Sequence, residues 1–225
     1  MNAEATHADQ PGERRAAPGP LALVQSFANT RDIEAGTDAL STPAALCDWL
    51  RDAGLIASRG RASDADLRAA TNVREAIRTL LVARREGGST RQAWTVLNRA
   101  VDAAQLTLRF SPETQRPRLE PRAGGVAAAL GSLVAIVAAA IDDGTWLRLK
   151  ACRRDACRWV FYDNSPAQAG VWCAMSICGN RTKARRHRER CRTGDDEANT
   201  ATRQRLGGPR HVGVGRDEAS PAHAG

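Results

Sequence analysis

Four cysteines near the carboxyl end constrain the folding of this chain more than any other feature. They form two C-x4-C pairs, Cys152 with Cys157 and Cys173 with Cys178, and fifteen residues separate the pairs. Thiolates are soft, charged and compact, so four of them suit Zn²⁺ when an intervening loop folds the pairs together. A zinc ion with four protein ligands has no open position for water and is structural. We therefore expect one structural zinc ion, without which a segment of about 45 residues could not bury enough apolar surface.

Four unlinked cysteines in a hydrophobic core are the alternative interpretation. Two cysteine loops of equal length, close to arginines and turn residues, disfavour it. The first 20 residues are polar and include acids, without the apolar segment of a secretory signal. We therefore expect a cytoplasmic protein, in which a reducing environment favours metal ligation or free thiols over disulfides.

One apolar stretch is long enough to raise the question of a membrane. Residues 126–141 are rich in alanine and are interrupted by Gly131 and Ser132. This length is short of the roughly 20 residues that a transmembrane helix needs. The sequence favours a buried helix and no membrane partner.

The positive charge of the chain is concentrated around the cysteines. The whole chain has a net charge of +8, but residues 146–193 contain 12 basic and 3 acidic residues, a net charge of +9. The remainder contains 21 basic and 22 acidic residues, a net charge of −1. A basic segment joined to a nearly neutral one indicates a polyanion as partner of the first and a different role for the second.

The residues after the last cysteine of the four predict a basic helix. Asn180 can cap it, and it should extend to about residue 192, with Glu189 as its only acid. A solvated charged face is the usual alternative for such a run, and arginines alone do not distinguish DNA from RNA. The candidate nucleic-acid-binding residues are Asn180, Arg181, Lys183, Arg185, Arg186 and Arg188.

The rest of the chain predicts a mainly α fold with a small β-hairpin. Apolar residues follow a helical period in most segments after residue 21, and they alternate only over 106–110. We expect a disordered N-terminus (1–20), a helical sensor domain (21–144), a small zinc-stabilised module (145–193) and a disordered tail (194–225).

The helical domain has no convincing catalytic set, so we expect no enzyme. Residues 21–143 contain no histidine, which removes histidine-based acid–base chemistry. A polar cluster of Asn29, Thr30 and Arg31 follows an apolar run and is a candidate effector pocket. The alternative is a helix end followed by a solvated loop.

Several motifs carry a family resemblance. Cys178-Gly179-Asn180-Arg181 is the name motif of the CGNR zinc finger, and the sequences over 146–152, 158–163 and 172–175 also resemble this finger. The region before it, including Asn29-Thr30 and residues 46–50, resembles the ABATE domain of stress-induced transcription regulators.

The resemblance implies a bacterial zinc-dependent DNA-binding regulator whose helical domain binds an effector or a partner. Residues 166–171 depart from the family pattern, because they carry no charge where the finger usually has arginines and an asparagine. A homodimer is a further expectation, since two half-sites multiply affinity.

Two other function classes stay open at this point. One is an RNA-binding protein. The other is a small-molecule-binding protein or enzyme with a purely structural zinc module. A zinc deaminase, the sharpest version of the second, needs an open metal position, which four thiolate ligands do not leave.

Overall fold

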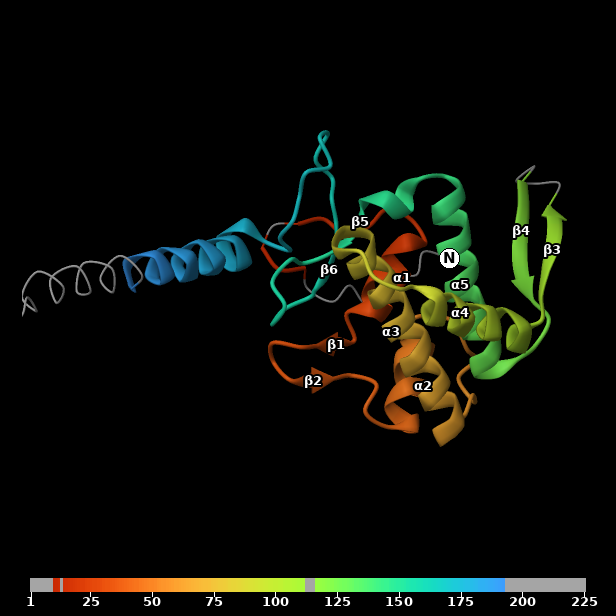
Figure 1. The fold of residues 1–225 in the computed structure, drawn as a ribbon. Helices are drawn as coiled ribbons and strands as arrows, with labels where there is room; N and C mark the ends of the chain where they lie inside the picture. Colours follow the sequence, from red (N-terminus) through yellow and green to blue (C-terminus); the bar gives the residue numbers. More distant parts are fainter. Residues whose placement is uncertain (1–9, 13, 112–115, 193–225) are drawn as a thin grey trace, which may run out of the picture. The chain divides into compact units, whose positions relative to one another are not determined.

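The computed structural model describes residues 10–12, 14–111 and 116–192, and it confirms a mainly helical fold with small hairpins (Figure 1). The chain divides into two units, Met1–Thr182 and Lys183–Gly225. The elements of the first unit are α1 (Leu21–Ala28), β1 (Arg31–Asp32), β2 (Thr37–Asp38), α2 (Pro43–Asp52), α3 (Asp64–Glu86), α4 (Arg91–Ala104), β3 (Leu106–Ser111), β4 (Arg116–Pro121), α5 (Gly125–Asp142), the 3₁₀ turn η1 (Thr145–Arg148), β5 (Leu149–Ala151), β6 (Val160–Tyr162) and the π-helical turn η2 (Met175–Gly179). Residues 180–192 are helical and run across the boundary into the second unit.

Local sequence signals place the starts of two helices as expected. The Thr42 side chain accepts a hydrogen bond from the backbone N–H of Ala45 at 3.1 Å, with proline in the first turn of α2. Ser63 and Asp66 form a reciprocal capping box at the start of α3. Thr90, at the start of α4, makes no side-chain capping bond.

Helix α5 lies at the centre of the N-terminal domain. It packs against α1, α4 and β4, and Leu133 on its buried face is fully buried. Gly131 permits the close approach of α4, because a Cβ at this position would lie 2.2 Å from the Cβ of Ala104. Among the described residues, α5 is the one helix long and apolar enough to cross a membrane, a test that core helices of soluble proteins also pass.

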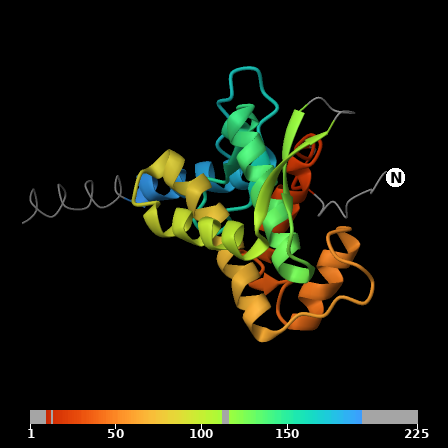
Figure 2. The ribbon, with the colours of Figure 1, turned by 90° about the vertical axis from the view of Figure 1, so that its right-hand side faces the viewer.

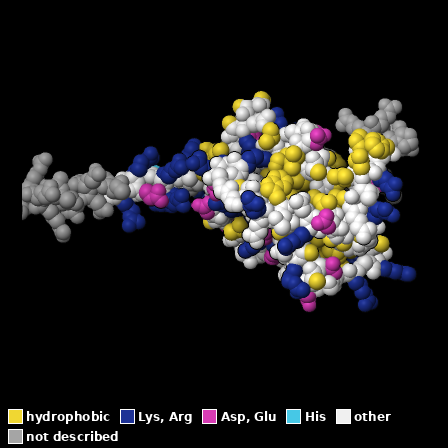
Figure 3. Space-filling view, turned by 45° about the vertical axis from the view of Figure 1, so that its right-hand side comes forward, with side chains coloured by type: hydrophobic (Ala, Val, Ile, Leu, Met, Phe, Trp, Pro, Cys, Tyr) yellow, Lys and Arg dark blue, Asp and Glu magenta, His cyan; other side chains and the backbone are white. Residues whose placement is uncertain are grey.

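The three strand pairs are separate two-stranded antiparallel sheets. The β3–β4 ribbon stands beside α5 in both ribbon views (Figure 1; Figure 2). Its register pairs Leu108 with Leu119 and Arg109 with Arg118, so apolar and basic side chains occupy opposite faces. Leu108 and Phe110 are exposed, and hydrophobic side chains are visible on this part of the surface (Figure 3).

Two arginines of α3 are buried and anchor the short β1–β2 hairpin and α1. Arg74 is 2% exposed and donates to both carboxylate oxygens of Asp38 at 2.7 Å and to Thr30 Oγ1 at 3.0 Å. Arg78 donates to the carbonyl oxygen of Ala28 at 2.8 Å. A bidentate arginine–carboxylate pair has strict geometry, so it fixes where the hairpin lies on α3.

The N-terminal segment differs from the sequence expectation of disorder over 1–20. Residues 10–12 and 14–20 are placed, and Ala17 is buried with its N–H donating to Gln25 Oε1 at 2.6 Å. Composition alone favours disorder here, but the segment finds partners in the folded protein. The remaining expected disorder, over 1–9 and the tail from 194, lies outside the described residues.

Candidate metal centre

The four predicted cysteines meet at one point. The sulfur atoms of Cys152, Cys157, Cys173 and Cys178 all lie within 4.8 Å of one another, and all four residues are buried. Cys173 Sγ lies 3.7 Å from Cys157 Sγ and 3.6 Å from Cys178 Sγ. A zinc tetrahedron with Zn–S bonds of about 2.3 Å has sulfur–sulfur edges of about 3.8 Å. The cluster therefore has the size of a four-thiolate zinc site.

Backbone hydrogen bonds position the first cysteine pair. Cys152 follows β5 directly, and its N–H donates to the carbonyl oxygen of Trp159 at 2.8 Å. The N–H of Cys157 donates to the carbonyl oxygen of Arg154 at 2.9 Å and closes a tight turn. The loop thus returns the chain to the start of β6 with both sulfurs on one side.

The second pair is positioned by an unusual helical turn. The N–H groups of Cys178 and Gly179 both donate to the carbonyl oxygen of Ala174, at 3.0 and 3.2 Å, in the π-helical turn η2. Such π-helical turns are rare and are frequently found at functional sites. Here the turn ends where the helical residues 180–192 begin.

The chemistry of the sulfurs fits a cation. The pKa of the Cys173 thiol is raised, first by hydrogen bonding to Cys152 and Cys157 and then by burial. Hydrogen bonding to Cys152 likewise raises the pKa of Cys157 to about 12. Four crowded sulfurs cannot all ionise by themselves, but a divalent metal stabilises the thiolates. A zinc ion would serve here as a structural link between the two cysteine loops.

Aromatic side chains cover the cysteine cluster. Phe161 is fully buried within it, and Trp159 and Trp172 pack against it. The guanidinium of Arg14 lies over the Phe161 ring at 4.4 Å and donates to the carbonyl oxygen of Trp172 at 3.0 Å. This arginine could not be predicted from the sequence, because no local pattern connects residue 14 with a site near residue 160.

Asp163 organises the loop that leads to the second cysteine pair. Its carboxylate accepts hydrogen bonds from Lys150 Nζ and the Gly170 N–H, both at 2.7 Å, and from Ser165 Oγ at 2.7 Å. Burial on its own would raise the pKa of Asp163, but these hydrogen bonds outweigh it and hold the pKa well below its usual range. A Cβ at Gly170 would lie 2.8 Å from this carboxylate, so glycine is required for the close approach.

The cysteine-bearing segment shares a core with the helical domain. Val160 and Tyr162 of β6 belong to the main hydrophobic core, while Phe161 between them belongs to the cysteine cluster. The Asn29 amide donates to the carbonyl oxygen of Val160 and accepts from its N–H, both at 2.8 Å. One face of this short strand therefore packs in the core of the helical domain, and the other face packs in the cysteine cluster.

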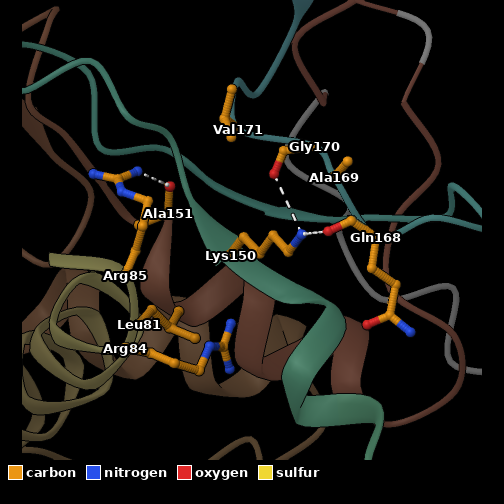
Figure 4. Close-up of a pocket in the computed structure, with 9 residues that line it drawn as sticks. All are labelled: Leu81, Arg84, Arg85, Lys150, Ala151, Gln168, Ala169, Gly170 and Val171. Carbon is orange, nitrogen blue, oxygen red and sulfur yellow. Dashed lines mark hydrogen bonds between the residues drawn. The ribbon is translucent and has the colours of Figure 1, made fainter. Parts of the chain in front are cut away.

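A cavity of about 270 Å³ lies between α3 and this segment (Figure 4). It is lined by Leu81, Arg84, Arg85, Lys150, Ala151, Gln168, Ala169, Gly170 and Val171. Figure 4 shows the Lys150 ammonium directed at the carbonyl oxygens of Gln168 and Gly170, and Arg85 donating to that of Ala151 at 3.1 Å. The cavity thus has basic and apolar walls, and many of its donors already have protein partners.

The residues predicted to form an effector pocket have other partners. Asn29 and Thr30 are buried, with Asn29 bonded to Val160 and Thr30 to Arg74. Arg31 is exposed and lies 3.5 Å from Glu75. This geometry favours a structural role for Asn29 and Thr30, and their part in effector binding stays a prediction.

The predicted nucleic-acid-binding residues lie on the helix after the cysteines. Asn180 donates to the carbonyl oxygen of Ser176 at 3.2 Å, and Arg181 forms an ion pair with Glu34. Lys183, Arg185, Arg186 and Arg188 are exposed. Within this helix, Arg185 pairs with Glu189 at 3.5 Å. Lysine and arginine side chains are visible along these residues in the space-filling view (Figure 3).

Two known family profiles match the chain. The profile "ABATE: Putative stress-induced transcription regulator" matches residues 21–143, more than half of the chain. The chain belongs to the ABATE family. The CGNR zinc finger profile matches residues 148–191, so the ABATE domain is followed by a CGNR zinc finger. No curated protein matches the chain significantly.

The two matches also settle the cofactor and the broad class. The matched finger and the four clustered cysteines identify the cofactor as Zn²⁺. The ABATE family is described as one of transcription regulators. In this protein, Glu34 and Glu86 of the ABATE domain pair with arginines of the finger. No sequence motif predicts these ion pairs.

Proposed function

We propose that this ABATE protein is a cytoplasmic, zinc-dependent DNA-binding transcription regulator. The observation that carries the proposal is the exposed run of basic side chains directly after a closed four-cysteine centre. Such a helix can lie in or across a groove of duplex DNA and neutralise phosphates on both sides. The residues assigned to this contact are Asn180, Arg181, Lys183, Arg185, Arg186 and Arg188.

In this proposal the zinc centre is structural and the ABATE domain is the regulatory part. The cavity beside α3 offers an effector a place where it would touch both the ABATE domain and the finger loop 168–171. A ligand there would couple to DNA binding only if it distinguished two arrangements of that loop. A homodimer would add the affinity of a second half-site.

The alternatives differ in what the finger does. Binding to RNA would use the same arginines, and a direct competition between duplex DNA and RNA separates the two. An enzyme with a purely structural zinc module would need a catalytic set elsewhere in the chain. A zinc deaminase would instead need an open position at the metal and an H-x-E triplet. The chain contains such a triplet, His187 with Glu189, but both residues lie on the helix that follows the four-cysteine site.

A salt titration tests the role of the helix. We expect that replacing Arg185 and Arg188 together by glutamine weakens binding to any duplex about tenfold near physiological salt. The slope of log K against log salt should fall by about 1.8, since each lost phosphate contact removes about 0.9. Fluorescence anisotropy with a labelled duplex measures both quantities.

The matched control removes the same charge from the ABATE domain. Arg91 and Arg99 are exposed on α4, and their double replacement by glutamine should leave the salt slope nearly unchanged. Equal slopes for all three proteins would remove the helix from the interface. Tighter binding to RNA than to duplex DNA in competition would replace DNA by RNA as the partner.

A further inference from the structure

Two arginines of the finger converge on one carboxylate of the ABATE domain. Arg154 Nη1 lies 2.5 Å from Glu34 Oε2, and Arg181 Nη1 pairs with Glu34 Oε1. Glu34 lies between β1 and β2, Arg154 lies in the first cysteine loop, and Arg181 is the arginine of the CGNR motif. Each oxygen of one small anion thus has its own guanidinium, an arrangement that also suits the oxygens of a phosphate.

A cysteine of the finger also lies close to the Arg154 guanidinium. Arg154 Nη1 lies 3.9 Å from Cys178 Sγ, and its side chain is only 22% exposed. A centre of four thiolates and one Zn²⁺ ion carries a formal charge of −2, which attracts a guanidinium at this distance. This attraction would help to hold the Arg154 guanidinium beside the metal centre when Glu34 is displaced.

The ABATE domain presents Glu34 on an anchored loop. The Asp38–Arg74 pair fixes β2 on α3, and Asp32 Oδ1 accepts from the Ala35 N–H at 3.0 Å within the turn. An anchored carboxylate has a high effective concentration at its partner. The hydrogen bond and ion pair with Arg154, joined by Arg181, outweigh the effect of burial and lower the pKa of Glu34, so it carries its negative charge at neutral pH.

We propose that Arg154 and Arg181 form one phosphate-binding site for the DNA backbone, and that Glu34 fills this site as an intramolecular competitor. This inference rests on the DNA-binding function proposed above and adds Arg154 to its interface. DNA must displace Glu34 before a backbone phosphate can bind both guanidinium groups. The side of Arg181 that faces solvent gives the phosphate an approach, since this side chain is 54% exposed.

The competition has a consequence for regulation. Any change that moves the β1–β2 loop away from the finger vacates the site and strengthens DNA binding, and DNA binding in turn favours the displaced loop. The ABATE domain would thereby act on DNA affinity through one carboxylate. Because Glu34 pairs with both guanidinium groups, a count of exposed, unpaired arginines would not identify this site.

The first test replaces the competitor. Glu34→Gln keeps the size of the side chain and removes its charge, so duplex affinity should rise by about three- to tenfold at constant salt. Asp48→Asn is the matched control, because it removes one acid of α2 whose ion pair, among the described residues, is the local one with Arg51. The control should change affinity less than twofold. Equal gains for Glu34→Gln and Asp48→Asn would reduce the effect to net charge and overturn the inference.

The second test asks whether the gain passes through the proposed site. In an Arg154→Gln, Arg181→Gln background, which should bind more weakly than wild type, Glu34→Gln should have no further effect. A full gain in that background would overturn the inference. One zinc per chain and an unchanged melting profile for each variant establish that the comparison is between folded proteins.

The outcomes distinguish this inference from the proposed function. If Arg185 and Arg188 control affinity while Glu34→Gln matches Asp48→Asn, the DNA-binding function stands and the competitor is rejected. If neither wild type nor Glu34→Gln binds duplex DNA, both are rejected.

Discussion

The side chain of Asn29, in the ABATE domain, binds the backbone of the zinc finger at Val160. Its amide group satisfies both backbone polar groups of Val160, and all of these groups are buried. From the sequence, Asn29 is a pocket candidate because it belongs to a polar cluster that follows an apolar run. In the folded protein the β5–β6 sheet has two strands, and the Asn29 amide makes the hydrogen bonds to Val160 that a third strand would otherwise make.

This role predicts the effect of removing the amide. Asn29→Ala should lower the free energy of unfolding by about 1–3 kcal/mol, since it leaves the buried N–H of Val160 without its partner. The carbonyl oxygen of Val160 would keep the longer hydrogen bond from Gln25 Nε2 at 3.3 Å. Asn98→Ala, at an exposed position of α4, is the control and should stay within about 0.5 kcal/mol of wild type. Urea unfolding measures both. A cost at residue 29 no larger than at residue 98 would contradict the role given to this amide.

At the scale of elements, the loop after β6 is held by charge and not by apolar packing. Asp163 gathers Lys150, Ser165 and the Gly170 backbone around one buried carboxylate. Residues 166–171 have no charge and no apolar period of their own, so they need such an external anchor. The anchor keeps the loop closed up to the second cysteine pair.

Replacing this carboxylate should destabilise the finger in a defined range of pH. Asp163→Asn should cost about 2 kcal/mol at neutral pH, because hydrogen bonds to charged groups are lost. A carboxyl with a folded pKa below its unfolded value of about 4 stabilises the fold above that pH, and the contribution is lost as the pH falls further.

The difference in unfolding free energy between wild type and Asp163→Asn should therefore be constant from about pH 5.5 to 8 and shrink below about pH 4. Chemical denaturation at a series of pH values measures it. Asp102→Asn, at an exposed position of α4, is the control and should show little difference at any pH. A slope for Asp163→Asn between pH 5.5 and 8 would show that the carboxyl titrates there and that its low pKa is wrong.

At the scale of the whole molecule, the zinc finger and the ABATE domain share one hydrophobic core but rely on different stabilising forces. Leu149, Ala151, Val160 and Tyr162 belong to the core of the helical domain, whereas the cysteine loops depend on the metal. Helices α1–α5 bury their apolar residues against one another without the metal ligands. We therefore expect the zinc finger to unfold when zinc is removed, while the helices of the ABATE domain stay folded.

Chelation tests this order. Stripping zinc should abolish the near-ultraviolet circular dichroism that arises from Trp159 and Trp172, while most of the helical signal in the far ultraviolet stays. Duplex binding should fall with the first signal, since the CGNR turn loses its anchor. Adding one equivalent of zinc should restore both. Complete loss of helix on chelation would show instead that the ABATE domain and the finger fold as one unit that depends on metal.

Features that depend on local or short-range spacing could be predicted from the sequence. The two cysteine pairs predict a four-sulfur site because each pair is a closed local loop, and Ser63 with Asp66 predicts a helix start because capping acts within one turn. The helical class, the β3–β4 hairpin and the basic helix follow from periodicity in the same way. These predictions need no knowledge of what lies elsewhere in the chain.

Which charged residues from distant parts of the sequence lie together depends on the tertiary structure. Glu34 lies 120 residues before Arg154, and Arg14 lies over an aromatic ring near the cysteines, without any periodic signal that connects them. An ion pair depends on the distance between charges in space, which the packing of α1, α3 and β6 sets. The sequence therefore predicts which arginines contact DNA, and the fold shows that an acid of the ABATE domain pairs with one of them, Arg181.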